Sequence, residues 1–238
     1  MDSRINRIGR INSFQSMGAV DGPGIRFVVF MQGCPLRCVY CHNPDTWSLE
    51  GQEFSVDEVC QQILRYKPYF GENGGVTVSG GEPLLQWEFV SELFRMLKEY
   101  GIHTALDTSG AGSIHGATEV LKYTDLVLCD MKFSTKESYR QYCNGSLDQT
   151  LDFIKLAEHK QVPLWIRHVV VPGLTDDKES LTCIARLAKQ FSNLAKFELL
   201  PFRKLCLSKY EVMGIPFPLA DHEECSDEAI KNLTGELA

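Results

Sequence analysis

The stretch IRFVVFMQGCPLRCVYCHNPDTW, residues 25–47, joins a short apolar run to a loop that holds three cysteines. The run 25–32 is rich in β-branched and aromatic residues, and this composition at this length predicts a β-strand. Gly33 and Pro35 then turn the chain, and Cys34, Cys38 and Cys41 follow within eight positions. A strand that ends in reactive side chains is typical of parallel α/β proteins, whose sites lie at the carboxyl ends of the strands.

Five further apolar runs of similar length follow, at residues 75–79, 102–108, 125–131, 163–171 and 196–200. Helical patterns separate them: a capping box at Ser55 and Glu58 begins the first, and the others cover 86–100, 116–123, 147–160 and 177–191. This alternation predicts parallel strands joined by right-handed crossovers. We therefore expect an α/β fold, a partial (β/α)6 TIM-like barrel of parallel strands with a closed or nearly closed sheet.

Composition and charge limit the class of protein. The chain has 238 residues, 44% of them hydrophobic, which predicts a single domain over 1–238 with a more polar C-terminal appendage from about residue 216, where Ser226 caps a last helix. A net charge of −7 without any run of Lys or Arg argues against nucleic acid and membrane surfaces as partners. The N-terminal residues lack the apolar segment of a signal peptide, and no stretch approaches the roughly 20 apolar residues of a spanning helix, so we expect a cytoplasmic protein.

The three clustered cysteines allow several interpretations. Structural zinc needs four ligands, and the nearest fourth candidate, His42, is poorly placed beside Cys41 to complete the same tetrahedron. A redox pair of Cys38 and Cys41 would leave Cys34 unused. A 4Fe-4S cluster with three cysteine ligands uses all three and leaves one iron open to a substrate or cofactor. The other six of the nine cysteines are scattered, which favours reduced, buried thiols over disulfides.

Polar residues also occur at the ends of the later strands. SGGEP at 79–83 follows the second strand, DTSG at 107–110 ends the third, DMK at 130–132 ends the fourth, and Arg167 lies in the fifth. In a parallel sheet these ends converge on one mouth, together with the cysteine loop. Singly, each has a structural explanation: a turn at Gly80 and Gly81, a surface ion pair of Asp130 with Lys132, or a helix cap at Asp107. Their joint placement favours a site.

The spacing C-x3-C-x2-C after the first strand, with GGE after the second, resembles the radical S-adenosylmethionine (radical SAM) superfamily. The segments SFQSMGAVDGPGIRFVVFMQGC, YCHNPDTW, SGGEPLLQ, GIHTALDTSG, TDLVLCDMK and WIRHVVVPG are similar, in order and spacing, to the glycyl-radical enzyme activases. The resemblance runs from about residue 8 to about residue 214. It is closest to the branch of that family that acts on pyruvate formate-lyase.

The resemblance implies a role for individual residues. Cys34, Cys38 and Cys41 would hold the 4Fe-4S cluster, and the S-adenosylmethionine contacts would be Tyr40, His42, Gly80, Gly81, Glu82, Asp130, Met131, Lys132, Arg167 and Arg203. For Glu82 the alternative is that it fixes the turn. Asp107 and Thr108 match the family's site for a monovalent cation. In VDGPGIR, residues 20–26, Asp21 would meet the partner's glycine-bearing loop, whereas the structural alternative is a hairpin turn. Trp47, Phe14 and Met17 are expected to be packing residues.

The resemblance also implies the reaction. A flavodoxin or ferredoxin would supply one electron, S-adenosylmethionine would be cleaved to methionine and a 5'-deoxyadenosyl radical, and that radical would take a hydrogen atom from a glycine of the partner enzyme. No protein acid or base is required. A monomer is expected. The alternatives are an activase of another glycyl-radical enzyme, a radical SAM enzyme acting on a small molecule, and a non-catalytic metal-binding module.

The target within the family is inferred from what the chain lacks. Only Cys60 lies between the cysteine loop and GGE, so the ferredoxin-like insert of many other activases is absent. The chain is also longer than the activases of anaerobic ribonucleotide reductase. Pyruvate formate-lyase is therefore the leading target. Two positions depart from the family pattern: Arg203 stands where histidine is usual, and DTSG replaces DTNG.

Overall fold

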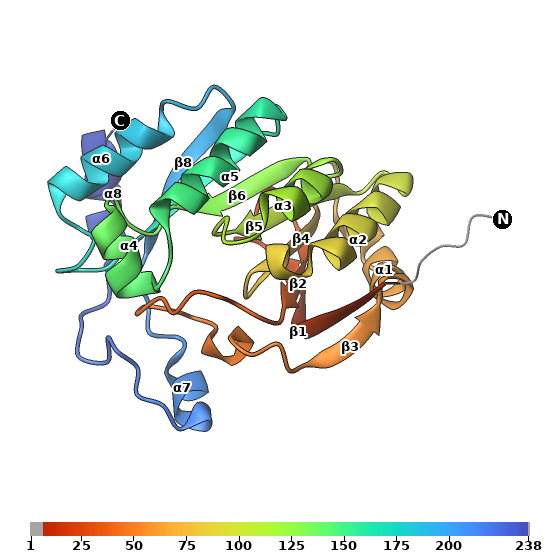
Figure 1. Ribbon diagram of the computed structural model, residues 1–238, viewed down its shortest axis with the longest axis horizontal. Coiled ribbons are helices and arrows are strands. Elements are labelled where there is room, and N and C mark those ends of the chain that lie inside the picture. The colour runs from red at the N-terminus through yellow and green to blue at the C-terminus, as the bar shows by residue number, and fades with distance from the viewer. Residues whose placement is uncertain (1–6, 238) are drawn as a thin grey trace.

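The computed structural model describes residues 7–237 and consists of one eight-stranded sheet with helices packed on it (Figure 1). The strand order is β3-β1-β2-β4-β5-β6-β7-β8. The strands are β1 (Ile8–Gly18), β2 (Arg26–Met31), β3 (Gln52–Ser55), β4 (Gly75–Gly80), β5 (His103–Thr108), β6 (Leu126–Asp130), β7 (Leu164–Val170) and β8 (Leu194–Pro201).

The six predicted strands are β2 and β4 to β8, and they pair in parallel. The mixed α/β fold with a partial barrel is therefore confirmed, although the sheet is open, with β3 and β8 at its edges. Two antiparallel strands were not predicted: β1 pairs with β2, and β3 pairs with β1. β1 is exposed at many positions and contains polar residues, so its sequence lacks the apolar run that identified the others.

The helices are α1 (Val56–Leu64), α2 (Trp87–Glu99), α3 (Ile114–Leu121), α4 (Lys136–Cys143), α5 (Leu147–His159), α6 (Lys178–Ala188), α7 (Leu207–Met213) and α8 (Asp227–Leu237). Short 3-10 turns are η1 (Pro44–Thr46), η2 (Lys67–Tyr69) and η3 (Pro83–Gln86). The capping box of Ser55 and Glu58 is confirmed at α1, and the Ser226 hydroxyl accepts a hydrogen bond from Ala229 N–H at α8. α4 and α7 were not predicted.

The helices cover one face of the sheet. Figure 1 shows α2, α3 and α5 in a row on this outer face, whereas α7 lies apart, next to η1. The predicted apolar face of α2 is buried in full: Phe89, Val90, Leu93, Phe94 and Leu97. This packing leaves the other face of the parallel strands for the site, and a second, smaller core packs the cysteine loop against α4, α7 and the C-terminal segment. No helix within residues 7–237 is long and apolar enough to cross a membrane.

Candidate active site

A cavity of about 370 Å³ lies where β4, β5, β6 and β7 end and the cysteine loop begins. Segments that are far apart in the sequence meet there, as predicted. Of the predicted site residues, those that line it are Asp21, Cys34, Cys38, Tyr40, Cys41, His42, Gly80, Gly81, Asp107, Thr108, Asp130, Lys132 and Arg167. The volume is within the range of small-molecule and cofactor sites.

The cysteine loop is fixed by backbone hydrogen bonds at both ends. Gly33 N–H donates to the Thr46 carbonyl (2.8 Å), which closes the loop on η1. Arg37 and Val39 donate to the carbonyls of Cys143 and Tyr142 (2.8 and 2.9 Å), so the middle of the loop rests on the C-terminal end of α4. The predicted curl of the chain therefore depends on α4, a helix that sequence reasoning missed.

All three cysteines of the loop are free thiols; Cys38 is buried, and Cys34 and Cys41 are partly buried. Burial raises the pKa of Cys34 to about 12 and also raises the pKa of Cys41. For Cys38 the first cause of a raised pKa is a contact with the thiol of Cys143, followed by burial. Within residues 7–237, no three His, Cys, Asp or Glu side chains lie close enough together to form a ready-made site for one metal ion. Binding a metal centre here requires deprotonation of these thiols.

The glycines after β4 are required by close backbone contacts. Gly80 has φ +108°, and a Cβ there would lie 2.4 Å from the Met31 nitrogen. A Cβ at Gly81 would lie 2.1 Å from the carbonyl oxygen of Gly33, the residue before Cys34. Gly81 and Glu82 also donate backbone hydrogen bonds to Met31 and Gly33 (2.9 and 2.7 Å). The GG sequence thus holds the end of β4 against the cysteine loop.

Glu82 is fully buried beneath this turn, and its carboxylate is saturated with hydrogen bonds. It accepts from Leu84 N–H (3.1 Å), the Thr108 hydroxyl (2.5 Å), and both the N–H and the hydroxyl of Ser109 (2.9 and 2.6 Å). These contacts favour the turn-fixing alternative for Glu82. They connect the ends of β4 and β5, and Ser109 was not predicted because a single serine carries no signal.

Four charged side chains form a connected network on the cavity wall. Arg167 donates to Asp107 Oδ1 (2.5 Å) and to Asp130 Oδ1 (2.9 Å from Nε), and Lys132 donates to Asp130 Oδ2 (2.6 Å). Their side chains are only 10–19% exposed, so this is not the surface ion pair considered as the alternative. Ser79, a residue not predicted, donates to Asp107 Oδ2 (2.6 Å).

The two carboxyl groups of the network have different pKa values. Burial opposes ionisation of Asp130, but Arg167 and Lys132 outweigh it and hold its pKa at about 2. Burial raises the pKa of Asp107 to about 6 against the attraction of Arg167. Although burial acts in the opposite direction, Asp130 raises the pKa of Lys132, and Asp107 with Asp130 raises that of Arg167. The wall therefore presents both signs of charge in one dry site.

Three predicted cofactor contacts do not line the cavity. Glu82 lies beneath the turn, and the Met131 side chain is buried in the main core between sheet and helices. The Arg203 guanidinium is directed to the Cys225 carbonyl and to Asp227 (2.5 Å), at the start of α8. Only its backbone approaches the site: the Arg203 carbonyl accepts a hydrogen bond from His42 Nε2 (2.6 Å). The Tyr40 hydroxyl donates to the Lys132 carbonyl (3.3 Å).

The segment VDGPGIR forms the turn between β1 and β2, which is the hairpin that the structural alternative describes. Gly22 and Gly24 have φ of +128° and +65°, which only glycine adopts readily. Asp21 nevertheless lines the cavity as well, and its carbonyl accepts a hydrogen bond from the Thr77 hydroxyl (2.6 Å). Burial raises the pKa of the Asp21 carboxyl.

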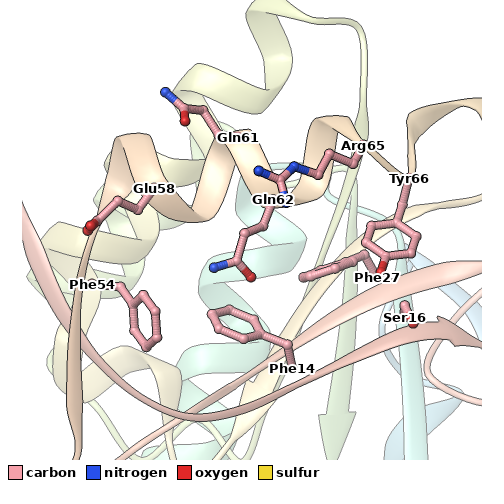
Figure 2. A pocket seen from close by; sticks show the side chains of 9 residues that line it. All are labelled: Phe14, Ser16, Phe27, Phe54, Glu58, Gln61, Gln62, Arg65 and Tyr66. Carbon is pink, nitrogen blue, oxygen red and sulfur yellow. The ribbon is translucent and has the colours of Figure 1, made fainter.

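A second cavity, of about 450 Å³, lies on the other side of the sheet from these residues, between α1 and the first three strands. Figure 2 shows Phe14, Phe27 and Phe54 on the strand side and Gln62 and Arg65 on the helix side. None of the predicted site residues lines it. The chemistry expected from the sequence is concentrated in the cavity at the strand ends, which we take as the candidate site.

Comparison with known proteins agrees with this placement. The family model described as the radical SAM superfamily matches residues 28–182, which include most of β2, the cysteine loop, the GG turn and the charged network. The chain belongs to the radical SAM superfamily.

Relatives of this radical SAM chain extend over nearly its full length. It is 48% identical over 228 residues to a pyruvate formate-lyase-activating enzyme of Clostridium pasteurianum, covering 95% of each chain. It is 46% identical over 234 residues to the protein of that name from Staphylococcus epidermidis, covering 94% of this chain and 92% of the relative.

Solved structures resemble the fold. A domain of a pyruvate-formate lyase-activating enzyme from Bacteroides vulgatus has a TM-score of 0.57 at 23% identity, covering 69% of this chain and 93% of that one. A radical SAM methyltransferase from Sphaerobacter thermophilus has a TM-score of 0.64 at 16% identity, covering 89% and 63%. At these identities the two structures support the architecture.

Proposed function

We propose that this protein is a pyruvate formate-lyase-activating enzyme, which uses S-adenosylmethionine to generate a glycyl radical on its partner enzyme. The observation that carries the proposal is the convergence of three free thiols, the Gly80–Gly81 turn and the charged network on one cavity at the strand ends. The full-length similarity to enzymes of that name supports the choice of partner.

The residues present fit the cofactors that the family implies. Cys34, Cys38 and Cys41 offer three thiols from one loop, which become cluster ligands on losing their protons, and the indole N–H of Trp47 is buried without a hydrogen-bond partner of ordinary geometry among the described residues. The amino acid part of S-adenosylmethionine is zwitterionic, and the wall offers cations at Lys132 and Arg167 and carboxylates at Asp107 and Asp130. Both ligands therefore find donors of suitable chemistry in the same cavity.

When bound, the 4Fe-4S cluster and S-adenosylmethionine would supply a one-electron reductive cleavage that yields methionine and a 5'-deoxyadenosyl radical able to take a hydrogen atom from glycine. The protein's own residues bind and orient. The three thiolates would hold the cluster. S-adenosylmethionine would be oriented by the charged network and by Gly80, Gly81, Tyr40 and His42. Met131, Glu82 and Arg203 do not line the cavity and would support the residues that do.

Low water content is the second contribution of the protein. Tyr40 is 4% exposed and Cys38 9%, and the aromatic and aliphatic side chains of the smaller core surround them. A site that excludes water protects a reactive radical from side reactions. Asp21, at the far side of the cavity from the cysteine loop along β4, is proposed to meet the backbone of the partner's glycine-bearing segment.

The remaining expectations are parts of the same proposal. The electron donor would be a flavodoxin or ferredoxin, and the protein would act as a cytoplasmic monomer. A monovalent cation at Asp107 and Thr108 would share the Asp107 oxygens with Arg167 and Ser79, because each carboxylate oxygen accepts one hydrogen bond and keeps a further lone pair. Comparing S-adenosylmethionine affinity in potassium, sodium and tetramethylammonium buffers tests the cation. Equal affinity in all three buffers would contradict it.

The test of function is electron paramagnetic resonance on pyruvate formate-lyase, mixed anaerobically with the reconstituted, reduced protein and S-adenosylmethionine. We expect the glycyl-radical doublet, its loss in Cys38→Ala, and its retention in Cys183→Ala, which removes a half-buried thiol on α6. Iron and sulfide analysis of the same samples separates a cluster from zinc.

Each other outcome identifies a rival. Accumulation of 5'-deoxyadenosine without a doublet would point to another glycyl-radical enzyme or to a small-molecule substrate. A zinc-loaded protein, or a cluster that never cleaves S-adenosylmethionine, would overturn the proposal in favour of a binding module. Cofactor cleavage that persists in reduced Cys38→Ala would exclude the three-cysteine site itself.

A further inference from the structure

Trp47, which the sequence suggested to be a packing residue, has an unsatisfied polar atom next to the cysteine loop. Its Nε1 is buried and, within residues 7–237, has no hydrogen-bond partner of ordinary geometry. A buried N–H without an acceptor costs about 1–3 kcal/mol. Folded proteins hold few such groups, and an ion, a water or a functional partner is a common explanation of one.

The indole ring is fixed by its neighbours. The Arg37 guanidinium lies over the ring, 4.9 Å from its centroid, and the Tyr210 ring packs against its edge at 6.1 Å and 87°. The Tyr210 hydroxyl donates to the Cys41 carbonyl (3.2 Å), and the Trp47 carbonyl accepts from Cys34 N–H (3.4 Å). The orientation of the indole is thus tied to two cysteines of the loop.

The Cys41 side chain is a potential acceptor beside this N–H, because Trp47 and Cys41 both pack against the same smaller core. Tyr210 contacts both residues, since its ring packs on the indole and its hydroxyl bonds to the Cys41 backbone, so the indole N–H and the Cys41 sulfur are held on the same side of the loop without a hydrogen bond of ordinary geometry. A thiolate is a better acceptor than a thiol because it carries a full negative charge. A hydrogen bond from the indole should therefore form when Cys41 becomes a metal ligand.

We propose that the Trp47 indole N–H donates a hydrogen bond to the Cys41 sulfur in the cluster-loaded protein and raises the reduction potential of the cluster. The inference rests on the proposed function, since it requires the cluster on Cys34, Cys38 and Cys41. Reduction adds negative charge to the cluster, and a donor aimed at a ligand sulfur stabilises that charge. Trp47 is then a positioning and tuning residue that makes one-electron reduction by the donor protein easier.

The test is the midpoint potential of the reconstituted cluster, measured by anaerobic redox titration in the absence of S-adenosylmethionine. Trp47→Phe keeps an aromatic ring and removes the N–H, and we expect a shift to a more negative potential. Trp165→Phe is the matched control, because that indole also lies beneath a cation, Lys196, at 4.5 Å, and does not line the cavity. The midpoint potential of the cluster in Trp165→Phe should equal that of the wild type. An unchanged or more positive potential in loaded Trp47→Phe would overturn the inference.

A second measurement does not depend on how well the variant folds. In wild-type protein labelled with 15N in its indoles, pulsed paramagnetic resonance of the reduced cluster should detect a nitrogen and an exchangeable proton coupled to the cluster. Lack of both couplings would refute the hydrogen bond. If the wild type binds no iron, the proposed function fails first. A loaded wild type without the couplings contradicts the tuning role alone.

Discussion

Two arginines are buried inside the same sheet, and their surroundings differ. Arg26, at the start of β2, is fully buried and bonds to neutral groups: Nε donates to the Thr77 hydroxyl (3.0 Å), Nη1 to His103 Nδ1 (3.1 Å) and Nη2 to the Val76 carbonyl. Arg167, in β7, is 8% exposed and is shared by two carboxylates on the cavity wall.

The difference separates an arginine that stabilises the fold, Arg26, from an arginine that belongs to the candidate site, Arg167. Burial lowers the pKa of Arg26 to about 10, because Asp125 and Asp21, which do not contact the guanidinium, offset only part of its desolvation. The pKa of Arg167 is raised despite burial, since Asp107 and Asp130 stabilise its charge. Buried ion pairs are weak evidence of a contribution to stability. A network of four such groups beside a cavity is instead an indication of function.

The largest effect is expected for Arg167→Met. The substitution keeps much of the volume and leaves Asp107 and Asp130 without the guanidinium they share, which should reduce the free energy of unfolding by about 3–5 kcal/mol. Urea denaturation of the anaerobic, cluster-free protein measures this. The cost should fall in Arg167→Met combined with Asp107→Asn, because one of the stranded carboxylates is then neutral.

A loss below about 1 kcal/mol in the single variant would show that the carboxylates relax into water, and that the wall is more open than its exposed fractions indicate. An equal loss in the single and double variants would show that Asp107 contributes nothing to the penalty. Either result would remove the contrast with Arg26.

For Arg26→Met the expected loss is smaller, about 1–3 kcal/mol, since only neutral acceptors lose their donor. The same urea experiment measures it. Assembly of the cluster and the midpoint potential should remain those of the wild type, because Arg26 does not line the cavity. A changed potential would mean that Arg26, at the start of β2, is coupled to the site through Thr77 and Asp21.

One serine and one threonine of β4 extend the comparison between the cavity wall and the surroundings of Arg26. Ser79 donates to Asp107, whereas Thr77, two residues earlier, donates to the backbone carbonyl of Asp21. Because the Ser79 hydrogen bond lowers the pKa of Asp107, Ser79→Ala should raise that pKa above its value of about 6. It should also reduce the free energy of unfolding by about 1–2 kcal/mol. Carbon-detected NMR of the carboxyl group gives the pKa, and Thr77→Val, which should leave it unchanged, is the control.

The six parallel strands could be predicted because each is a short apolar run between helical patterns. β1 and β3 could not, since exposed polar residues such as Arg10, Ser13 and Glu53 interrupt their apolar pattern. α4 has few apolar residues and is recognisable mainly by its Thr135 cap. The sheet remains open because β3 and β8 do not meet, a long-range relation that no local pattern encodes.

The residues of the site could be predicted more fully than their partners. Asp107, Asp130 and Lys132 stand out at strand ends and Arg167 stands out as a charge within an apolar strand, but the strand register that joins them appears only in three dimensions. Met131 was included because it lies between two such residues. The alternation of side chains along a strand directs it to the opposite face. Trp47 was treated as packing because an unpaired indole nitrogen cannot be recognised from the sequence.

The smallest expected effect is on the pH dependence of stability, and it concerns His103, the neighbour of Arg26. A guanidinium has only donors, so His103 Nδ1 must be the acceptor of the hydrogen bond from Arg26 and the ring must be neutral. Burial and then the charge of Arg26 lower the pKa of His103 below its ordinary value of 6.5. Between the two pKa values the unfolded chain binds more protons, so stability decreases as the pH falls below about 6.5.

His103→Asn retains an acceptor for Arg26 and removes the titration. We therefore expect the wild type to lose more free energy of unfolding between about pH 7 and pH 5 than the variant, by up to about 1 kcal/mol. Other titrating groups are common to both proteins, and the difference between their urea midpoints isolates His103. Parallel pH profiles would show that the ring has the same pKa in the folded and the unfolded chain, which the donor geometry of Arg26 does not permit. The neutral surroundings assigned to Arg26 would then be wrong, whereas those of Arg167 would be unaffected.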